Sequence, residues 1–268
     1  MRLYIFFVCP IPRVLLKVLY NVSVLPVMGD VTAQAIYLND CYQKEFESIV
    51  QEVNNGKYIV LEQTLFYPTS GGQPNDTGIL ITEDGHIYKV LAVAKSGNDI
   101  VHEVDHDGLK QADKVKGIID WDRRYKHMRM HTAAHILDAV LYNEAGALCT
   151  GNQLGYDKSR IDFALDEFDR DKMEHYIKLA NSWVEKKIDV KTYYLPRDEA
   201  LKIPGIVKLA AIMPPEIKEL RIVEIPGIDL QADGGTQVKN TGEIGKIVLL
   251  SVENKGKKNR RLYYELAE

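Results

Sequence analysis

The chain has few cysteines, and their positions do not suggest pairing. Its three cysteines are Cys9, Cys41 and Cys149, and no CxxC pair occurs. An odd number at such wide spacing excludes a disulfide framework and favours a reducing compartment. We therefore expect a cytoplasmic protein in which each cysteine is a small buried or half-buried apolar residue.

Uninterrupted apolar runs are also missing. Residues 1–28 are apolar and basic and contain no acidic residue, but Pro10, Pro12, Arg13 and Lys17 break them well short of the ~18 residues that a membrane span needs. No A-x-A-like cleavage site follows, so a signal peptide is a poor fit. We expect no membrane association and interpret residues 1–28 as an extension upstream of a translation start at Met28.

Positive charge is not in excess, because the formal net charge is −4. A nucleic-acid partner would therefore have to be met by a local basic patch. The sequence has no internal repeat, no P-loop and no dinucleotide fingerprint. Its composition, 46% apolar and 27% charged, suits a globular protein of one large or two modest domains with a substantial core.

The first part of the chain, from Gln34 to Ile118, has mostly β signals. Turn sequences rich in Asn, Gly and Asp (NNGK, EDGH, SGND and DHDG) separate short apolar runs, which is typical of a small barrel or sandwich. The expected strands are AIYLND, YIVLEQTLFYP, GILITEDGHIYKVLAVAK, DIVHEVD and KVKGIID. KEFESIVQEV is expected to be a helix.

The pattern then changes, near Gly117 to Trp121. Asp122 is expected to cap a long helix that ends at Gly146, and Asp169 to open a second one. GNQLGYDKSRIDFAL predicts a hairpin, RDEALKI a short helix, and KTYYLP, LRIVEIPGI, GKIVLLSVE and RRLYYEL strands. The fold class is therefore α+β: a β-barrel-like domain over residues 29–120, then an α+β domain over residues 121–268 with its long helix against an antiparallel sheet.

Two histidines, His131 and His135, share one face of the expected long helix. HxxxH is the helical spacing for two imidazole ligands of one metal. Thr132 stands where the HExxH of metalloproteases has glutamate. From the residues alone, a metal pair and a pair of satisfied core histidines both remain open.

Two further stretches carry possible chemistry. IDLQADGGTQVKNTGEIG contains Asp233, a respectable zinc ligand, and Gln237, a rare one. It is equally compatible with a Gly-Gly turn followed by a helix cap. FYPTSGGQPNDTG gathers glycines and small polar residues in a loop that suits phosphate or sugar binding, or simply a long turn.

In combination, these motifs resemble the AlaX family, the freestanding relatives of the alanyl-tRNA synthetase editing region. FYPTSGGQPNDTG is similar to its glycine-rich motif, and WDRRYKHMRMHTAAHIL and DGGTQVKNTGEIG to the two halves of its metal motif. The resemblance covers residues 35 to 265, and the barrel-like first domain corresponds to the medium-length form. Family-like sequence begins just after Met28.

The resemblance implies hydrolysis of mischarged tRNA(Ala), chiefly seryl-tRNA(Ala) and also glycyl-tRNA(Ala), with one Zn²⁺. It places His131 and His135 in the family HxxxH, Asp233 at a cysteine position and Gln237 at a histidine position. That last departure leaves three readings: a metal held by three groups and water, a weakened site, or a non-catalytic tRNA-binding relative with a degraded site. Thr132 is a candidate for contact with the serine hydroxyl.

Basic residues gather at two places where tRNA contact is expected; no obligate protein partner is predicted. One cluster begins the long helix and the other lies near the C-terminus, and the glycine loop is expected to meet the acceptor end. For either cluster alone, a solvated surface is the simpler interpretation. The residues singled out are Gly71, Gly72, Arg123, Arg124, Lys257, Lys258, Arg260 and Arg261.

Overall fold

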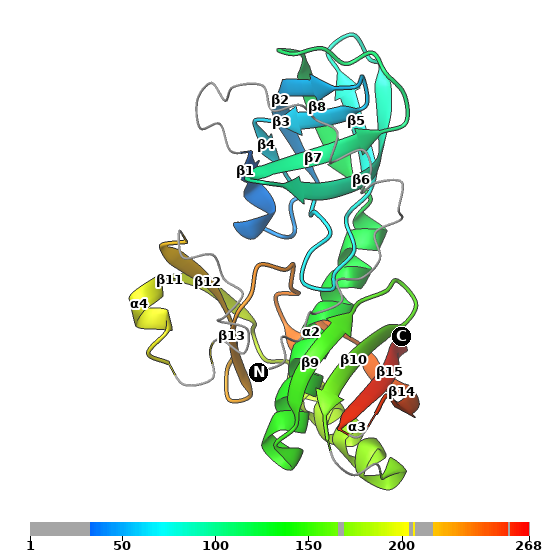
Figure 1. Ribbon diagram of the computed structural model, residues 1–268, viewed down its shortest axis with the longest axis vertical. Helices are drawn as coiled ribbons and strands as arrows, with labels where there is room; N and C mark the ends of the chain where they lie inside the picture. The colour runs from blue at the N-terminus through cyan, green and yellow to red at the C-terminus, as the bar shows by residue number, and fades with distance from the viewer. Residues whose placement is uncertain (1–32, 166–168, 204–205, 207–216, 257, 268) are drawn as a thin grey trace, which may run out of the picture.

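The computed structural model describes residues 33–165, 169–203, 206, 217–256 and 258–267. The predicted N-terminal extension and Lys257 lie outside them. A closed barrel, two further sheets and a long helix make up most of the described chain (Figure 1). This arrangement confirms the expected α+β class. No helix among the described residues is both long and apolar enough to cross a bilayer.

The barrel is closed by six antiparallel strands in the order β2-β3-β7-β6-β5-β8. Its interior is filled by large apolar side chains, among them Phe46, Leu61 and Phe66. A parallel pair of short strands, β1 (Gln34–Ala35) and β4 (Gln63–Thr64), lies outside this closed sheet. The barrel strands are β2 (Glu45–Asn54), β3 (Tyr58–Leu61), β5 (Gly78–Thr82), β6 (Ile87–Ser96), β7 (Asp99–Val104) and β8 (Lys114–Ile119).

Two local predictions in this part of the chain are wrong. The expected helix in KEFESIVQEV is strand β2, because its first six residues alternate exposed and buried and so present Phe46, Ser48 and Val50 to one face. The expected strand AIYLND is mostly a 3-10 turn, η1 (Ile36–Leu38), which buries Tyr37.

Helix α2 (Trp121–Ala145) follows the last barrel strand directly and runs into the second part of the molecule (Figure 1). The Asp120 side chain caps it by accepting the Arg123 N–H, so the cap lies two residues before the predicted Asp122, which occupies the first turn. Gly146 ends the helix as expected, in a left-handed conformation with φ of 62°. Burial extends around most of α2 from Met128 to Leu141, as suits a central helix.

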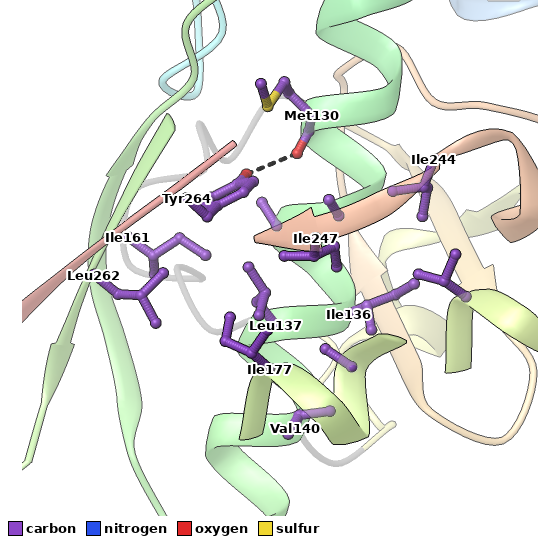
Figure 2. Packing of buried hydrophobic residues seen from close by; sticks show 14 of the residues in the cluster. Met130, Ile136, Leu137, Val140, Ile161, Ile177, Ile244, Ile247, Leu262 and Tyr264 are labelled. Carbon is purple, nitrogen blue, oxygen red and sulfur yellow. Dashed lines mark hydrogen bonds between the residues drawn. The ribbon is translucent and has the colours of Figure 1, made fainter. Parts of the chain in front are cut away.

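An antiparallel sheet packs against α2, in the order β14-β15-β10-β9. Helix α3 (Arg170–Glu185), capped by Asp169 as predicted, packs on both α2 and β14. Figure 2 shows Leu137 of α2 among apolar side chains of the sheet and α3, and the Tyr264 hydroxyl donating to the Met130 carbonyl at 2.8 Å. The strands are β9 (Leu148–Gln153), β10 (Ser159–Ala164), β14 (Lys246–Asn254) and β15 (Asn259–Ala267).

A third sheet, in the order β11-β12-β13, brings the stretch that begins at Ile228 to α2. Strand β13 contacts α2, and the chain then passes through the Asp233–Gln237 segment to a 3-10 turn, η3 (Thr241–Glu243). The strand KTYYLP and the short helix after it are confirmed. The elements are β11 (Lys191–Pro196), α4 (Arg197–Ala200), β12 (Glu219–Ile225) and β13 (Asp229–Ala232).

The glycine-rich loop, residues 65–77, joins strand β4 to barrel strand β5 and is fastened to α2 by a buried ion pair. Arg124 and Asp76 are both fully buried, and the Arg124 Nε lies 3.0 Å from Asp76 Oδ2. Arg124 also donates to the carbonyl oxygens of Cys41 and Leu65. The structure therefore corrects the prediction that Arg124 contacts tRNA, because a fully buried guanidinium cannot reach a phosphate.

A buried histidine should make the stability of the barrel depend on pH. His102 is fully buried and bonded to Thr64 and the Ile59 carbonyl, and burial lowers its pKa to about 4. Between pH 6.5 and 4 the unfolded chain binds a proton that the folded chain refuses, so stability is lost as the pH falls. This shift corresponds to about 3 kcal/mol.

His102→Gln, which keeps hydrogen-bonding capacity but does not titrate, should remove that part of the pH dependence. Denaturant unfolding of both proteins at pH 7 and pH 4 measures the difference. Parallel losses in the two proteins would show that the pKa of His102 is not lowered in the folded state.

Candidate metal centre and its pocket

Two imidazoles meet on consecutive turns of α2. His131 and His135 are 5% and 6% exposed, and their ring centroids are 5.1 Å apart. The helical spacing alone puts them on one face. Whether they form a metal pair or two satisfied core histidines depends on what each ring nitrogen contacts.

Each Nδ1 is occupied by a fixed oxygen, which leaves each Nε2 facing the same space. His131 Nδ1 lies 2.9 Å from Gln73 Oε1, and His135 Nδ1 lies 2.7 Å from Asp229 Oδ2. The Thr236 N–H donates to the same Gln73 oxygen, and Gln73 Nε2 donates to the Thr236 hydroxyl, so the amide is held in that orientation. Such partners set the tautomer and aim of metal-binding histidines.

Asp233 faces both Nε2 atoms. Its carboxylate oxygens lie 3.7 Å from His131 Nε2 and 3.8 Å from His135 Nε2. One potential ligand atom from each of the three residues lies within 4.8 Å of the ligand atoms of the other two. Two imidazoles and a carboxylate are an established zinc donor set. A small inward movement would bring all three within bonding distance of one ion, so the residues fit a metal.

The Asp233 segment is held against α2 by close backbone contact. A Cβ at Gly235 would lie 2.1 Å from His131 Cε1, so only glycine fits there. Arg221 on β12 donates to the carbonyl oxygens of Asp233 and Gly235 at 2.9 and 3.0 Å. The alternative of a Gly-Gly turn followed by a helix cap is confirmed in part, because Asn240 caps the 3-10 turn η3 later in the same stretch, while Asp233 and Gln237 lie in the loop before it.

Gln237 joins the cluster in space. Its Nε2 donates to Asp233 Oδ2 at 2.9 Å and lies 3.2 Å from His135 Nε2, while its Oε1 accepts the Thr132 hydroxyl at 2.7 Å. Rotating the amide by half a turn would direct Oε1 to the metal space and let Nε2 donate to Thr132. Thr132 would then give its single proton to the Met128 carbonyl, 3.1 Å away. The site therefore accommodates Gln237 as a weak fourth donor.

Thr132 lies behind the three potential ligands. It is fully buried, and its hydroxyl contacts the Met128 carbonyl, Gln237 and the Val238 N–H. These contacts fix the position of the Gln237 segment. Contact between Thr132 and a serine hydroxyl stays a prediction.

The pKa values of the two histidines are shifted in opposite directions. Burial lowers the pKa of His131 to about 4, which Asp233 only partly opposes. Burial also disfavours charge on His135, but bonds to Asp229 and Asp233 outweigh it and raise its pKa to about 10. Burial would raise the pKa of Asp233, but the two imidazoles hold it well below its usual range. Because a ligand nitrogen must be deprotonated, metal binding here would release the His135 proton.

A pocket of about 170 Å³ opens onto this cluster. His131, His135 and Asp233 line it, and β9 contributes a run of lining residues, from Cys149 to Asn152. Gly71, with φ of 56°, is exposed and lines the pocket, so the glycine loop reaches this cluster, and its contact with the acceptor end of the tRNA stays a prediction. Gly72 packs so closely on Asn152 that a Cβ would lie 1.7 Å from Asn152 Oδ1. The pocket has room for a small acyl group, several times a water molecule's share of liquid volume.

The basic residues that were predicted to contact tRNA differ in their burial and in the groups that they already bind. Arg260 is 5% exposed and donates to Asn254 and the Gly256 carbonyl, so it braces the β14–β15 turn and cannot meet a phosphate. Arg261 is paired with Asp162, with Nε 2.6 Å from Oδ1. Arg123 is half-buried, and its Nε donates to the Asn75 carbonyl. Lys258 is exposed, and its contact with tRNA stays a prediction.

Sequence reasoning did not single out several residues of this site. Gln73 lay within the glycine-rich motif, but nothing local pointed from it to His131. Asp229 and Gln231 had a usable signal, since residues two apart on a strand share a face. This alternation along β13 directs the side chains of Asp229 and Gln231 toward α2.

The sequence matches two family models. Residues 17–123 match the model described as tRNA synthetases class II (A), and residues 220–263 match that of the threonyl and alanyl tRNA synthetase second additional domain. The second match contains Asp233 and Gln237.

Full-length relatives match over most of the chain. The chain is 52% identical to the alanyl-tRNA editing protein AlaX-M of Methanosarcina barkeri, over 88% of this chain and 99% of that protein. The AlaX-M protein of Saccharolobus solfataricus is 50% identical, over 86% and 98%. The alanine–tRNA ligase of Pyrococcus abyssi is 39% identical, over 82% of this chain but 24% of the ligase.

Proposed function

The chain belongs to the AlaX-M family of alanyl-tRNA editing proteins, and from this premise we propose that it hydrolyses mischarged tRNA(Ala) in the cytoplasm. Its main substrate is seryl-tRNA(Ala), with glycyl-tRNA(Ala) a second one. A synthetase pocket built for alanine rejects glycine or serine by only ~1–3 kcal/mol, so a separate hydrolytic sieve is needed. The chain spans nearly the whole length of its AlaX-M relatives.

The observation that carries this proposal is the convergence of two imidazole Nε2 atoms on Asp233 at the side of a small pocket. We propose that His131, His135 and Asp233 hold one Zn²⁺, with Gln237 as a fourth, weak donor. Zn²⁺ bound there would supply Lewis-acid polarisation of the ester carbonyl or a water of lowered pKa. A fixed donor set of this kind argues against the non-catalytic alternative with a degraded site.

The chain's own residues position the substrate. Gln73 and Asp229 hold the two imidazoles, Arg221 holds the Asp233 segment, and β9 and β13 enclose the aminoacyl group. An aminoacyl ester is already reactive, so holding its carbonyl and a water in register supplies much of the acceleration. Gly71 at the pocket edge, with Gly72 beside it, lies where the acceptor end of the tRNA enters; Arg123 and Lys258 are further candidates for phosphate contact.

Deacylation tests this function directly. The full-length protein is expected to release serine from seryl-tRNA(Ala) well above the buffer rate while sparing alanyl-tRNA(Ala), and seryl-tRNA of another identity should separate editing of the alanine system from editing in general. Hydrolysis no faster than in buffer would overturn the proposal. Gln237→His tests the fourth donor: activity present only in that variant would show that the natural site is degraded.

A further inference from the structure

An exposed aromatic ring lies beside the glycine-rich loop, close to the pocket. Tyr156, which is 45% exposed, belongs to the turn between β9 and β10. Two residues before it, the Leu154 N–H donates to the Gly72 carbonyl at 2.8 Å. Asn152, two residues earlier again, lines the pocket and packs against Gly72. The same short segment therefore forms part of the pocket, holds the glycine-rich loop and carries the ring of Tyr156.

The backbone that carries Tyr156 is fixed in place. The Gly155 N–H donates to the hydroxyl of buried Ser159 at 3.1 Å. A Cβ at Gly155 would lie 2.2 Å from the Lys158 carbonyl oxygen, so only glycine fits this tight turn. A ring on a fixed turn loses little conformational freedom when a flat ligand packs against it, which favours binding.

Helix α2 contacts the same ring and supplies a positive charge. The ring of fully buried His127 meets that of Tyr156 nearly at right angles, with the centroids 6.5 Å apart. Within the part of the chain that the structure describes, neither ring nitrogen of His127 has a hydrogen-bond partner, so this imidazole serves as a packing surface for Tyr156. Lys126 Nζ lies 5.9 Å from the centre of the Tyr156 ring. The turn thus presents an aromatic ring with a cation beside it.

We propose that Tyr156 stacks against a base of the unpaired 3′ end of the tRNA and that Lys126 pairs with a neighbouring phosphate. This inference rests on the proposed function. Proteins bind unpaired nucleotides by stacking the bases on exposed aromatic rings and by meeting the phosphates with cations. The ester in the pocket is attached to the terminal ribose, so the last bases of the strand must lie near the pocket, where Tyr156 is.

Stacking of this kind should affect binding of the substrate more than the chemical step. The base lies away from the reacting ester, so the contact is equally strong in the bound substrate and in the transition state. Tyr156→Ala is therefore expected to lower kcat/KM for seryl-tRNA(Ala) by about 5- to 150-fold, the factor for one stacked base, almost entirely through a higher KM. Tyr156→Phe keeps the ring and should stay close to wild type.

Removing single bases from the tRNA tests the contact itself. Seryl-tRNA(Ala) is prepared with an abasic nucleotide at each of the last three positions in turn, and kcat/KM is measured for wild type and Tyr156→Ala. At one position the wild type should lose about the same factor as Tyr156→Ala loses on the intact substrate, and the variant should lose little more, because both changes remove one interaction. Losses that add at all three positions would overturn the inference.

Two further variants separate this role from a general effect on the protein. Tyr194→Ala, a change of an equally exposed tyrosine on β11, should behave as wild type on every substrate. Lys126→Gln should lower the slope of log Kd for uncharged tRNA(Ala) against log salt concentration by about 0.7, as for one phosphate contact to a single strand. An unchanged slope would overturn the part of the inference that concerns Lys126.

The outcome for Tyr156 can be told apart from the outcome for the proposed function. If the wild type hydrolyses seryl-tRNA(Ala) but Tyr156→Ala lowers kcat instead of raising KM, or Tyr156→Phe is as impaired as Tyr156→Ala, only the stacking inference fails. If the wild type hydrolyses nothing, the proposed function fails, and the Kd for uncharged tRNA(Ala) still decides about Tyr156: equal values for wild type and Tyr156→Ala would overturn the inference as well.

Discussion

His131→Ala and His135→Ala are each expected to reduce seryl-tRNA(Ala) hydrolysis to the buffer rate and to lower Zn²⁺ affinity by more than about 100-fold. With a carboxylate and a weak amide as the other donors, the site depends on both imidazoles. Removing a residue that only supports a ligand already costs about 10- to 100-fold, so losing a ligand should cost more. Competition with a chromogenic chelator measures the affinity, and deacylation measures the rate.

Two further variants test whether these losses are specific to the imidazole ligands. Asp229→Asn keeps the His135 ligand but weakens its support, so its affinity should fall between those of wild type and His135→Ala. His175→Ala, an exposed histidine change on α3, should alter neither measurement. Full activity in a His131→Ala protein that no longer binds zinc would refute metal-assisted hydrolysis at this site.

Local sequence patterns predicted the parts of this site that local structure determines. His131 and His135 share a face because they are four apart on a helix, and Asp233 is a recognisable ligand type beside two glycines. The supporting residues were out of reach, because the contacts of Gln73 with His131 and of Asp229 with His135 join residues 58 and 94 positions apart. Only the folded chain brings them together.

The errors in the fold have the same origin. KEFESIVQEV has both helix-forming residues and a period-two pattern, and pairing with β3 and β8 inside a closed sheet decided for the strand. The prediction for Arg124 was wrong about its exposure, because in the sequence it is one of several basic residues at the start of a helix. Its neighbour Arg123 stays half-buried at the surface, and one step along the helix turns Arg124 into the interior against Asp76.

That buried ion pair carries the largest expected effect on stability. Arg124→Ala should lower the free energy of unfolding by about 3–5 kcal/mol, because it leaves Asp76 as an uncompensated charge in the interior. Arg123→Ala, which removes the hydrogen bond from the neighbouring Arg123 Nε to the Asn75 carbonyl, should cost no more than about 1.5 kcal/mol. Denaturant unfolding measures the free energy of unfolding of both variants. Equal losses would show that the buried ion pair contributes no more to stability than the surface hydrogen bond of Arg123.

Replacing both partners should recover most of that loss, since apolar residues can substitute for a buried ion pair. Arg124→Met with Asp76→Leu is therefore expected to be more stable than Arg124→Ala. Stability and activity should then separate, because Asp76 also accepts the Tyr67 N–H and anchors the loop that carries Gln73 to His131. If the double variant folds well but binds zinc less tightly, the ion pair serves the site as well as the fold; unchanged zinc affinity would mean that Gln73 is held independently of it.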